Sequence, residues 1–104
     1  MHVSHLLRGV AYLIVDTKIR DTARYEEYKD LAKPIIERFG GEYLARGGEL
    51  YSDQCDLWTP TRIVVIKFES MQKAKSFLES DEYKPIKAIR IEAAKSTMLL
   101  VDGL

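Results

Sequence analysis

The most restrictive feature of this sequence is that its strand-forming segments are apolar on both faces. Successive side chains of a strand point to opposite faces, so a sheet covered on one side only alternates apolar and polar residues. In residues 10–15 (VAYLIV), 62–68 (RIVVIKF) and 97–101 (TMLLV), apolar side chains occupy both sets of alternating positions. The sheet built from these segments therefore needs a cover on each of its faces.

Helical periodicity follows the first of these strands. Asp21 is a favoured helix-capping residue, and the apolar side chains after it recur at intervals of three and four. Because Pro34 lacks an amide donor, we expect a kink inside this helix. The pattern predicts a helix over residues 22–39, with an apolar stripe made of Tyr25, Tyr28, Ala32, Ile35, Ile36 and Phe39.

The second half of the chain repeats the pattern of strand and helix. Residues 43–46 are predicted to form a strand, and residues 49–61 a long connection to the strand at 62–68. Ser70 caps a helical region that extends to about Ala93, which Pro85 makes either one kinked helix or two short ones.

The order β-α-β-β-α-β predicts an α+β, ferredoxin-like fold, which is a four-stranded antiparallel sheet with both helices on one face. We expect residues 10–104 to form this single domain and residues 1–9 to form an N-terminal arm. A large aliphatic side chain left in water forgoes about 1.5–3 kcal/mol, and monomers rarely expose a large apolar patch. We therefore predict a two-fold symmetric homodimer joined sheet to sheet. The alternative is a monomer with an unusually apolar surface.

The charge balance excludes several classes of partner. The 104 residues include 16 basic and 16 acidic side chains, and no run of like charge is long enough for a nucleic-acid-binding or membrane-binding tail. Nothing approaches the length of a membrane span, so we expect a cytoplasmic protein. Since Cys55 is the single cysteine, an internal disulfide is impossible and no thiol cluster is available for zinc.

Signals for a cofactor are also missing from the sequence. His2 and His5 lie near the start of the chain, where side chains are usually solvated rather than bound to a metal. Gly47 and Gly48 do not open a helix, so they do not form a phosphate-binding or dinucleotide-binding loop. Cys55 has acidic neighbours and no histidine nearby in the sequence, which argues against a thiolate nucleophile. We expect no metal and no organic cofactor.

Two glycine pairs enclose the short strand that ends on Arg46. We expect Gly40 and Gly41 to form a left-handed end of the first helix. Gly47 and Gly48 are expected to let the strand bulge or bend as it enters the long loop. The bend would aim Arg46 toward either a pocket or a partner subunit.

Arg46, Asp16 and Tyr83 are the candidate catalytic residues. The guanidinium of Arg46 suits a carboxylate or an enolate, and its alternative is an ion pair with Asp16, Glu42 or an acid of a partner subunit. Asp16 stands where an apolar strand stops; it is a candidate general base if burial raises its pKa, or a turn residue. Tyr83 either presents its hydroxyl to a pocket or packs in the core.

Trp58 and Arg62 are candidate ligand-binding residues, because they flank Pro60 at the end of the long loop. Trp58 either walls a pocket for a flat organic ligand or packs across the dimer interface. Tyr25 and Tyr28 lie on the core stripe of the first helix, and we expect them to be structural.

Four ordered segments together resemble domain-of-unknown-function family 1330, within the dimeric α/β-barrel superfamily. They are residues 11–16 (AYLIVD), 39–48 (FGGEYLARGG), 58–68 (WTPTRIVVIKF) and 80–83 (SDEY). The sequence departs from the family pattern at Lys67, where an acid is usual, at Glu69 and Asp81, where proline is usual, and in residues 1–8.

The resemblance implies a ferredoxin-like fold and a two-sheet dimer. The superfamily includes cofactor-independent monooxygenases acting on aromatic polyketides, muconolactone isomerases, haem-degrading proteins and chlorite dismutases, whereas the family itself has no settled activity. Fold analogy does not assign a function, so two hypotheses remain.

The first hypothesis is a cofactor-independent enzyme acting on a small apolar or aromatic acid or enol. Arg46 would hold the anionic oxygen, Asp16 or Tyr83 would move a proton, and Trp58 would shape the entrance. The second hypothesis is a non-catalytic binding or structural homodimer. An enclosed cavity that receives Arg46 and a second titratable group favours the enzyme, and filled space favours the structural role.

Overall fold

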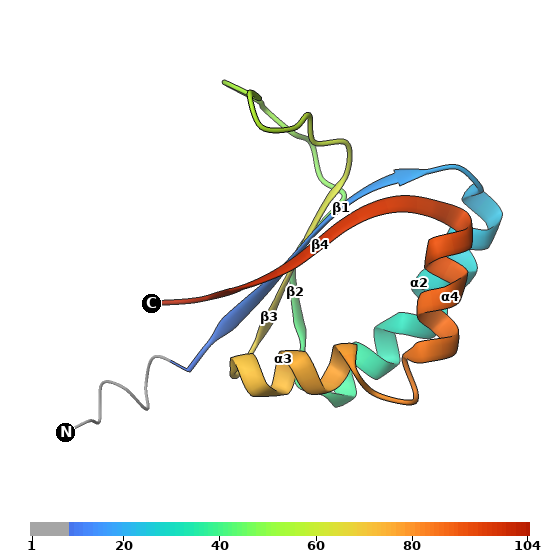
Figure 1. Cartoon of the computed structure of the whole chain (residues 1–104), viewed down its shortest axis with the longest axis vertical. Coiled ribbons are helices and arrows are strands. Elements are labelled where there is room, and N and C mark those ends of the chain that lie inside the picture. Colours follow the sequence, from blue (N-terminus) through green and yellow to red (C-terminus); the bar gives the residue numbers. More distant parts are fainter. Residues whose placement is uncertain (1–8) are drawn as a thin grey trace.

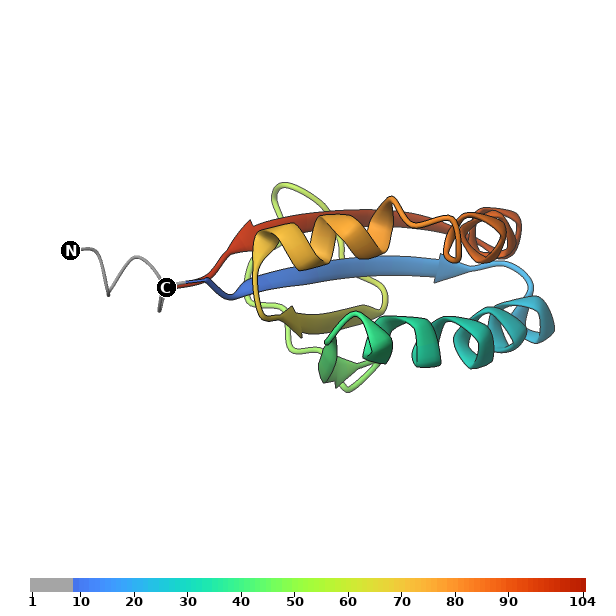
Figure 2. The ribbon, with the colours of Figure 1, turned by 90° about the horizontal axis from the view of Figure 1, so that it is seen from below.

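The computed structural model describes residues 9–104, which contain one four-stranded antiparallel sheet. The strands are β1 (Ala11–Ile19), β2 (Glu42–Arg46), β3 (Ile63–Phe68) and β4 (Ala94–Asp102), in the spatial order β2-β3-β1-β4. Helices α2 (Thr22–Arg38), α3 (Met71–Leu78) and α4 (Lys84–Ala93) lie together on one face of the sheet (Figures 1 and 2). The predicted ferredoxin-like fold is confirmed. His2, His5 and the predicted arm, except for Gly9, lie outside the described residues.

The second helical region consists of two helices, α3 and α4, rather than one kinked helix. Pro85 lies in the first turn of α4, where an amide donor would have no partner within the helix. In the connection, the Ser80 hydroxyl donates to the Phe77 carbonyl at 2.8 Å and accepts from the Tyr83 amide at 3.2 Å. These bonds hold the start of α4, and with it Tyr83, against the end of α3.

Helix α2 runs without interruption through Pro34 and ends as the glycine pair predicts. Gly40 adopts a left-handed φ of 84°, and its amide donates to the Glu37 carbonyl at 3.0 Å. The Gly41 amide donates to the Ile36 carbonyl at 2.8 Å. This pair of bonds is the Schellman arrangement, which satisfies carbonyls that the helix end leaves without partners.

Strands β1 and β4 are longer than the apolar runs alone suggest. They pair over nine residues, from Ala11 opposite Asp102 to Ile19 opposite Ala94. The extension is possible because Thr17 is buried and its hydroxyl lies 3.4 Å from that of Ser96 on the neighbouring strand. Polar side chains that find partners within the sheet thus continue the ladder past the end of the apolar pattern.

The two faces of the sheet differ in what covers them. The core lies between the helices and the buried side chains of alternate positions, such as Leu13, Val15, Ile66 and Phe68. No helix of residues 9–104 lies on the opposite face, and the connection from β2 to β3 projects from that side (Figures 1 and 2). This uncovered face carries Tyr12 and Ile14 from β1, Ile63 and Val65 from β3, and Leu99 and Val101 from β4.

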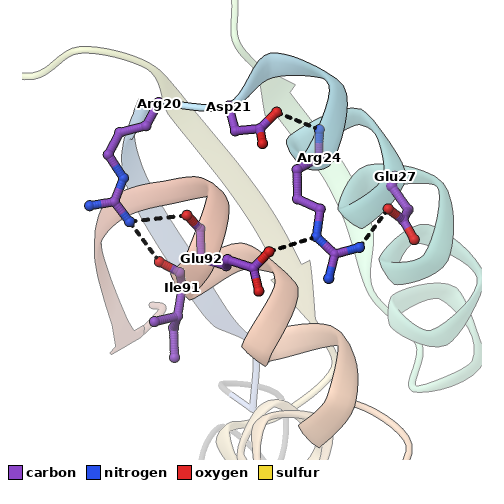
Figure 3. A network of polar contacts seen from close by, with 6 residues as sticks. All are labelled: Arg20, Asp21, Arg24, Glu27, Ile91 and Glu92. Carbon is purple, nitrogen blue, oxygen red and sulfur yellow. Dashed lines mark hydrogen bonds and ion pairs between the residues drawn. The ribbon is translucent and has the colours of Figure 1, made fainter.

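Two arginines tie the start of α2 to the end of α4 (Figure 3). Arg20 donates to the carbonyls of Ile91 and Glu92 at 3.0 and 3.1 Å. Arg24 pairs with the carboxylates of Glu92 at 3.1 Å and Glu27 at 2.7 Å. Exposed ion pairs contribute little stability each, so the main effect of this network is to orient α2 against α4.

Candidate functional site

A small cavity of about 30 Å³ lies between the sheet and α2. Its walls are mostly apolar side chains of β1, β3 and α2. The lining residues that carry polar groups are Tyr25, Tyr28, Lys29, Tyr43, Arg46 and Arg62. Arg46 and Arg62 thus reach a largely apolar space, whereas the ammonium of Lys29 pairs with Glu26 at 3.0 Å. Apolar walls with a few cationic groups are the usual composition of a site for an organic anion.

A β-bulge turns Arg46 toward this cavity. Simple alternation from Tyr43, which pairs with Ile66, would place Arg46 on the uncovered face. The register shifts between Tyr43 and Ala45, so that Arg46 pairs with Val64 and reaches the face covered by the helices. Bulges often re-aim a side chain in this way.

The guanidinium of Arg46 makes no ion pair with another residue of the described chain. Its central carbon instead lies 4.8 Å from the centre of the Tyr43 ring, a cation–π contact at an exposed position. The expected alternatives of ion pairs with Asp16 or Glu42 are therefore not observed. Both edges of the guanidinium fork stay available to an anion.

Arg62 reaches the same cavity from the residue before β3. Its Nη1 atom donates to the Tyr25 hydroxyl at 3.3 Å, and its central carbon lies 5.4 Å from the centre of the Tyr25 ring. The side chain packs against Gly47, which has a left-handed φ of 72°. Gly47 therefore provides the predicted bend after β2, whereas the bulge lies earlier in that strand.

Tyr83 is fully buried and does not line the cavity itself. Its hydroxyl lies 2.8 Å from that of Tyr28, and it accepts a hydrogen bond from Nε of the buried Arg90 at 3.3 Å. Tyr28 lines the cavity. Burial, together with the neighbouring Tyr83, raises the pKa of Tyr28 far above its usual range, so this hydroxyl keeps its proton.

Asp16 and Trp58 lie on the uncovered side of the sheet, away from the cavity. Asp16 Oδ1 accepts from the amides of Thr61 and Arg62 at 2.8 and 3.0 Å, and Oδ2 accepts from Nε1 of Trp58 at 2.8 Å. Partial burial acts to raise the pKa of Asp16, but these hydrogen bonds outweigh it and hold the pKa below its usual value. The condition for a general base, a pKa raised by burial, is therefore not met, and Asp16 instead accepts hydrogen bonds from the end of the long loop.

Three larger hollows lie outside the cavity, and all are open to solvent; one of them, of about 370 Å³, lies at the edge of the sheet beside Glu42, Lys67 and Glu69. A second, of about 660 Å³, is lined only by residues 51–58 and 60 of the long loop. Another, of about 220 Å³, lies beside Asp16 and Trp58 and includes Lys18, Lys95 and Thr97. None of the three would enclose a ligand between structural elements, so the small cavity remains the better candidate site.

The structure separates the five sequence candidates into three groups. Arg46 and Arg62 line the same cavity, Tyr83 stands one hydrogen bond behind it, and Asp16 and Trp58 belong to the opposite face.

Sequence reasoning missed three polar residues of this region: Tyr28, Lys29 and Arg90. For Arg90 a signal existed, because it falls at apolar spacing between Ile86 and Ala93 on α4. An arginine at such a position must find a buried partner.

The structure adds two findings on metals and membranes. Residues 9–104 hold no group of three or more His, Cys, Asp or Glu side chains arranged to bind a metal ion. Over the same residues, no helix has both the length and the apolar composition needed to cross a membrane.

Comparison with known sequences gives a family match. Residues 10–104 match the model of a family described as Domain of unknown function (DUF1330). No curated protein matches this chain.

Several solved structures resemble the fold. A protein of unknown function from Rhodopseudomonas palustris has 17% identity and a TM-score of 0.73, over 93% of this chain and 84% of that one. A dimeric ferredoxin-like protein of unknown function from Jannaschia sp. has 10% identity and a TM-score of 0.70, over 90% and 99%. SnoaB, a cofactor-independent oxygenase from Streptomyces nogalater, has 11% identity and a TM-score of 0.66, over 92% and 94%. At these identities the likeness establishes the fold alone.

Proposed function

The chain belongs to the DUF1330 family, and from this premise we propose that it binds the anionic form of a small apolar or aromatic acid or enol in the cavity between its sheet and α2. The observation that carries the proposal is the convergence of Arg46 and Arg62, neither of which has an ion-pair partner within residues 9–104, on a largely apolar space. Apolar walls take the body of the ligand, and the cations take its charged oxygen.

The same arrangement suits a reaction that passes through an enolate. Cations fixed at a water-poor site stabilise negative charge that develops on oxygen. We therefore place the protein among cofactor-independent enzymes of the monooxygenase or isomerase type. SnoaB offers a precedent for the first of these on the same fold. In this proposal Arg46 and Arg62 hold the anionic oxygen, and Tyr83 acts only through Tyr28.

The ligand needs more room than the cavity of about 30 Å³ provides. Strand β2 is the element whose movement would most easily enlarge the cavity, because it is a five-residue edge strand paired on one side only. It also carries Tyr43 and Arg46, which stand at the surface of the cavity. In the proposal, these two side chains move outward to admit the ligand.

A thermal-shift screen of aromatic acids, quinones and polyketide-like enols tests the proposal. We expect at least one compound to raise the melting temperature of the wild type. The Arg46→Ala variant should bind that compound about ten- to a hundredfold more weakly, since a charge-assisted hydrogen bond contributes about 1.5–3 kcal/mol. Lys87→Ala, which removes an exposed cation on α4, is the matched control and should respond like the wild type. Failure of every compound to stabilise the wild type would refute the proposal.

A separate observation, the uncovered apolar face, supports the alternative of a binding or structural homodimer. All three helices cover the other face, and Leu99 and Val101 on this face are 40% and 43% exposed. In the two-fold arrangement common among homo-oligomers, a second copy would bury the uncovered face of each subunit against that of the other. The Jannaschia protein, which has the same fold, is dimeric. We propose that this chain also dimerises through the uncovered face, whether or not it is an enzyme.

Light scattering tests the dimer. We expect a mass twice the 12.0 kDa of the chain for the wild type. Leu99→Lys should shift the population toward monomer, because it places a charge on the uncovered face. Ile91→Lys is the control, since Ile91 is 56% exposed on α4 and lies on the helical side. A wild-type particle of 12.0 kDa at micromolar concentration contradicts the dimer.

A further inference from the structure

A chain of three buried side chains links α4 to the cavity. Arg90 is 7% exposed and donates from Nε to the Tyr83 hydroxyl at 3.3 Å. The Tyr83 hydroxyl lies 2.8 Å from the Tyr28 hydroxyl, and Tyr28 lines the cavity. The distance between the two oxygens does not show which tyrosine donates. A count of the hydroxyl hydrogens and their acceptors does.

Two hydroxyl groups hold two hydrogens, and the contact between Tyr28 and Tyr83 uses one of them. Arg90 only donates, so it accepts neither hydrogen. Apart from each other, the two hydroxyls have no further acceptor within residues 9–104. One hydrogen therefore remains without a partner in the protein.

The remaining hydrogen belongs to Tyr28. If Tyr28 donated to Tyr83, the Tyr83 hydrogen would be orphaned at a side chain that is 0% exposed, and an unsatisfied buried donor is costly. If Tyr83 donates to Tyr28, the free hydrogen lies on the residue that borders the cavity. The positive charge of Arg90 favours the second arrangement, because it polarises the Tyr83 hydroxyl and makes it a better donor.

We propose that Tyr28 is a hydrogen-bond donor to the ligand in the cavity, and that the ligand carries a second oxygen, a carbonyl or enolate, besides the anionic group held by Arg46 and Arg62. This inference rests on the proposed function and narrows the ligand class to keto or enol acids. Tyr83 and Arg90 act as positioning residues, since Tyr83 contacts Tyr28, Arg90 contacts Tyr83, and neither lines the cavity. The high pKa of Tyr28 fits a donor, because a hydroxyl that keeps its proton is not a general base.

Neutron diffraction on a deuterated crystal of the full chain tests the order of the hydrogen bonds without any ligand. The expected map shows the Tyr83 deuterium between the two oxygens and the Tyr28 deuterium directed into the cavity. The opposite order overturns the proposal. This result is independent of whether the proposed function is correct.

A matched pair of probes tests the contact with the ligand. We choose 3- and 4-acetylbenzoate, each compared by calorimetry with its isopropylbenzoate isostere, which lacks the carbonyl oxygen. Tyr28→Phe should weaken the better-bound acetylbenzoate about tenfold and should not weaken its isostere, since only the carbonyl accepts from Tyr28. Tyr51→Phe, at a side chain that is 91% exposed, is the control and should bind both probes like the wild type.

The outcomes distinguish an error in the Tyr28 contact from an error in the anion site. If wild type binds both probes and Tyr28→Phe weakens them equally or not at all, the Tyr28 contact is wrong and the anion-binding proposal stands. If Arg46→Ala binds the acetylbenzoate as tightly as wild type, the anion site is wrong, and the neutron map still decides the order of the hydrogen bonds. If the melting temperature of Tyr28→Phe lies above the temperature of the assay, the variant is folded during the measurement.

Discussion

The guanidinium of Arg62 packs against Gly47, and a Cβ atom placed on that glycine would lie 2.9 Å from Nε of Arg62. Gly47 also has a φ of 72°, which side chains other than glycine rarely adopt. We expect Gly47→Ala to lower the free energy of unfolding by about 1–2 kcal/mol from the left-handed backbone alone. Urea denaturation measures this loss.

Gly48 provides the control at the neighbouring position. A Cβ on Gly48 meets no atom within 4 Å, and its φ is not positive. Gly48→Ala should therefore leave stability unchanged or raise it by about 0.4–1 kcal/mol, because alanine restricts the unfolded chain. Equal losses at the two glycines would show that the contact with Arg62 and the backbone angle do not matter.

Asp16 holds the indole of Trp58, and this contact predicts the effect of Asp16→Asn. Asparagine keeps one oxygen for the amides of Thr61 and Arg62 but turns an NH₂ group toward the indole N–H, so two donors face each other. We expect a loss of about 1 kcal/mol in the free energy of unfolding. Trp58 is the single tryptophan, so its emission should shift to longer wavelength. Asp53→Asn in the same loop should leave the emission unchanged.

The low pKa of Asp16 gives the same contact a pH dependence. The hydrogen bonds hold the pKa in the folded state below the ordinary value of 3.8. The stability that ionised Asp16 contributes is therefore complete above pH 3.8 and is lost as the pH falls through the folded-state pKa. The difference in unfolding free energy between wild type and Asp16→Asn should shrink over this acidic range. A difference that stays constant from neutral to acidic pH would contradict this origin.

Local pattern predicted most of the fold, because strand and helix periods and the cap at Gly40 are properties of short segments. The ends of β1 and β4 were harder to predict. Thr17 and Ser96 are polar and interrupt the apolar runs, yet they continue the ladder because they lie beside each other across two strands. This pairing joins residues that are 79 positions apart, so the periodicity within one strand cannot predict it.

The candidate site was only partly predictable, and the reasons differ between residues. Alternation along β1 already places Asp16 on the face of Tyr12 and Ile14, away from the helices. The position of Arg46 depends on the bulge after Tyr43, and no residue type in that strand predicts a bulge. The partner of Arg90, the Tyr83 hydroxyl, lies seven residues earlier at the start of the same helix, but the contact of Tyr83 with Tyr28 forms only when α4 packs beside α2.

Tyr83→Phe tests the buried hydrogen bonds through stability. The substitution keeps the ring but removes the acceptor of Arg90 and the partner of Tyr28. We expect a loss of about 1–3 kcal/mol in the free energy of unfolding, because buried polar groups are left unsatisfied. Tyr51→Phe removes an exposed hydroxyl and should stay within about 0.5 kcal/mol of wild type. Equal stability of Tyr83→Phe and wild type would show that the network contributes nothing to folding.

The raised pKa of Tyr28 predicts a loss of stability at alkaline pH. In the unfolded chain this hydroxyl ionises near its ordinary value of 10.0, whereas burial and Tyr83 keep it protonated in the fold. Its contribution to stability is therefore complete below pH 10.0 and is lost as the pH rises further, by at most about 1.4 kcal/mol per pH unit. Denaturation at a series of alkaline pH values should show that Tyr28→Phe loses less stability than wild type, and that Tyr51→Phe follows wild type. Parallel curves for Tyr28→Phe and wild type would show that the hydroxyl ionises in the folded protein, and this would remove its role as a permanent donor.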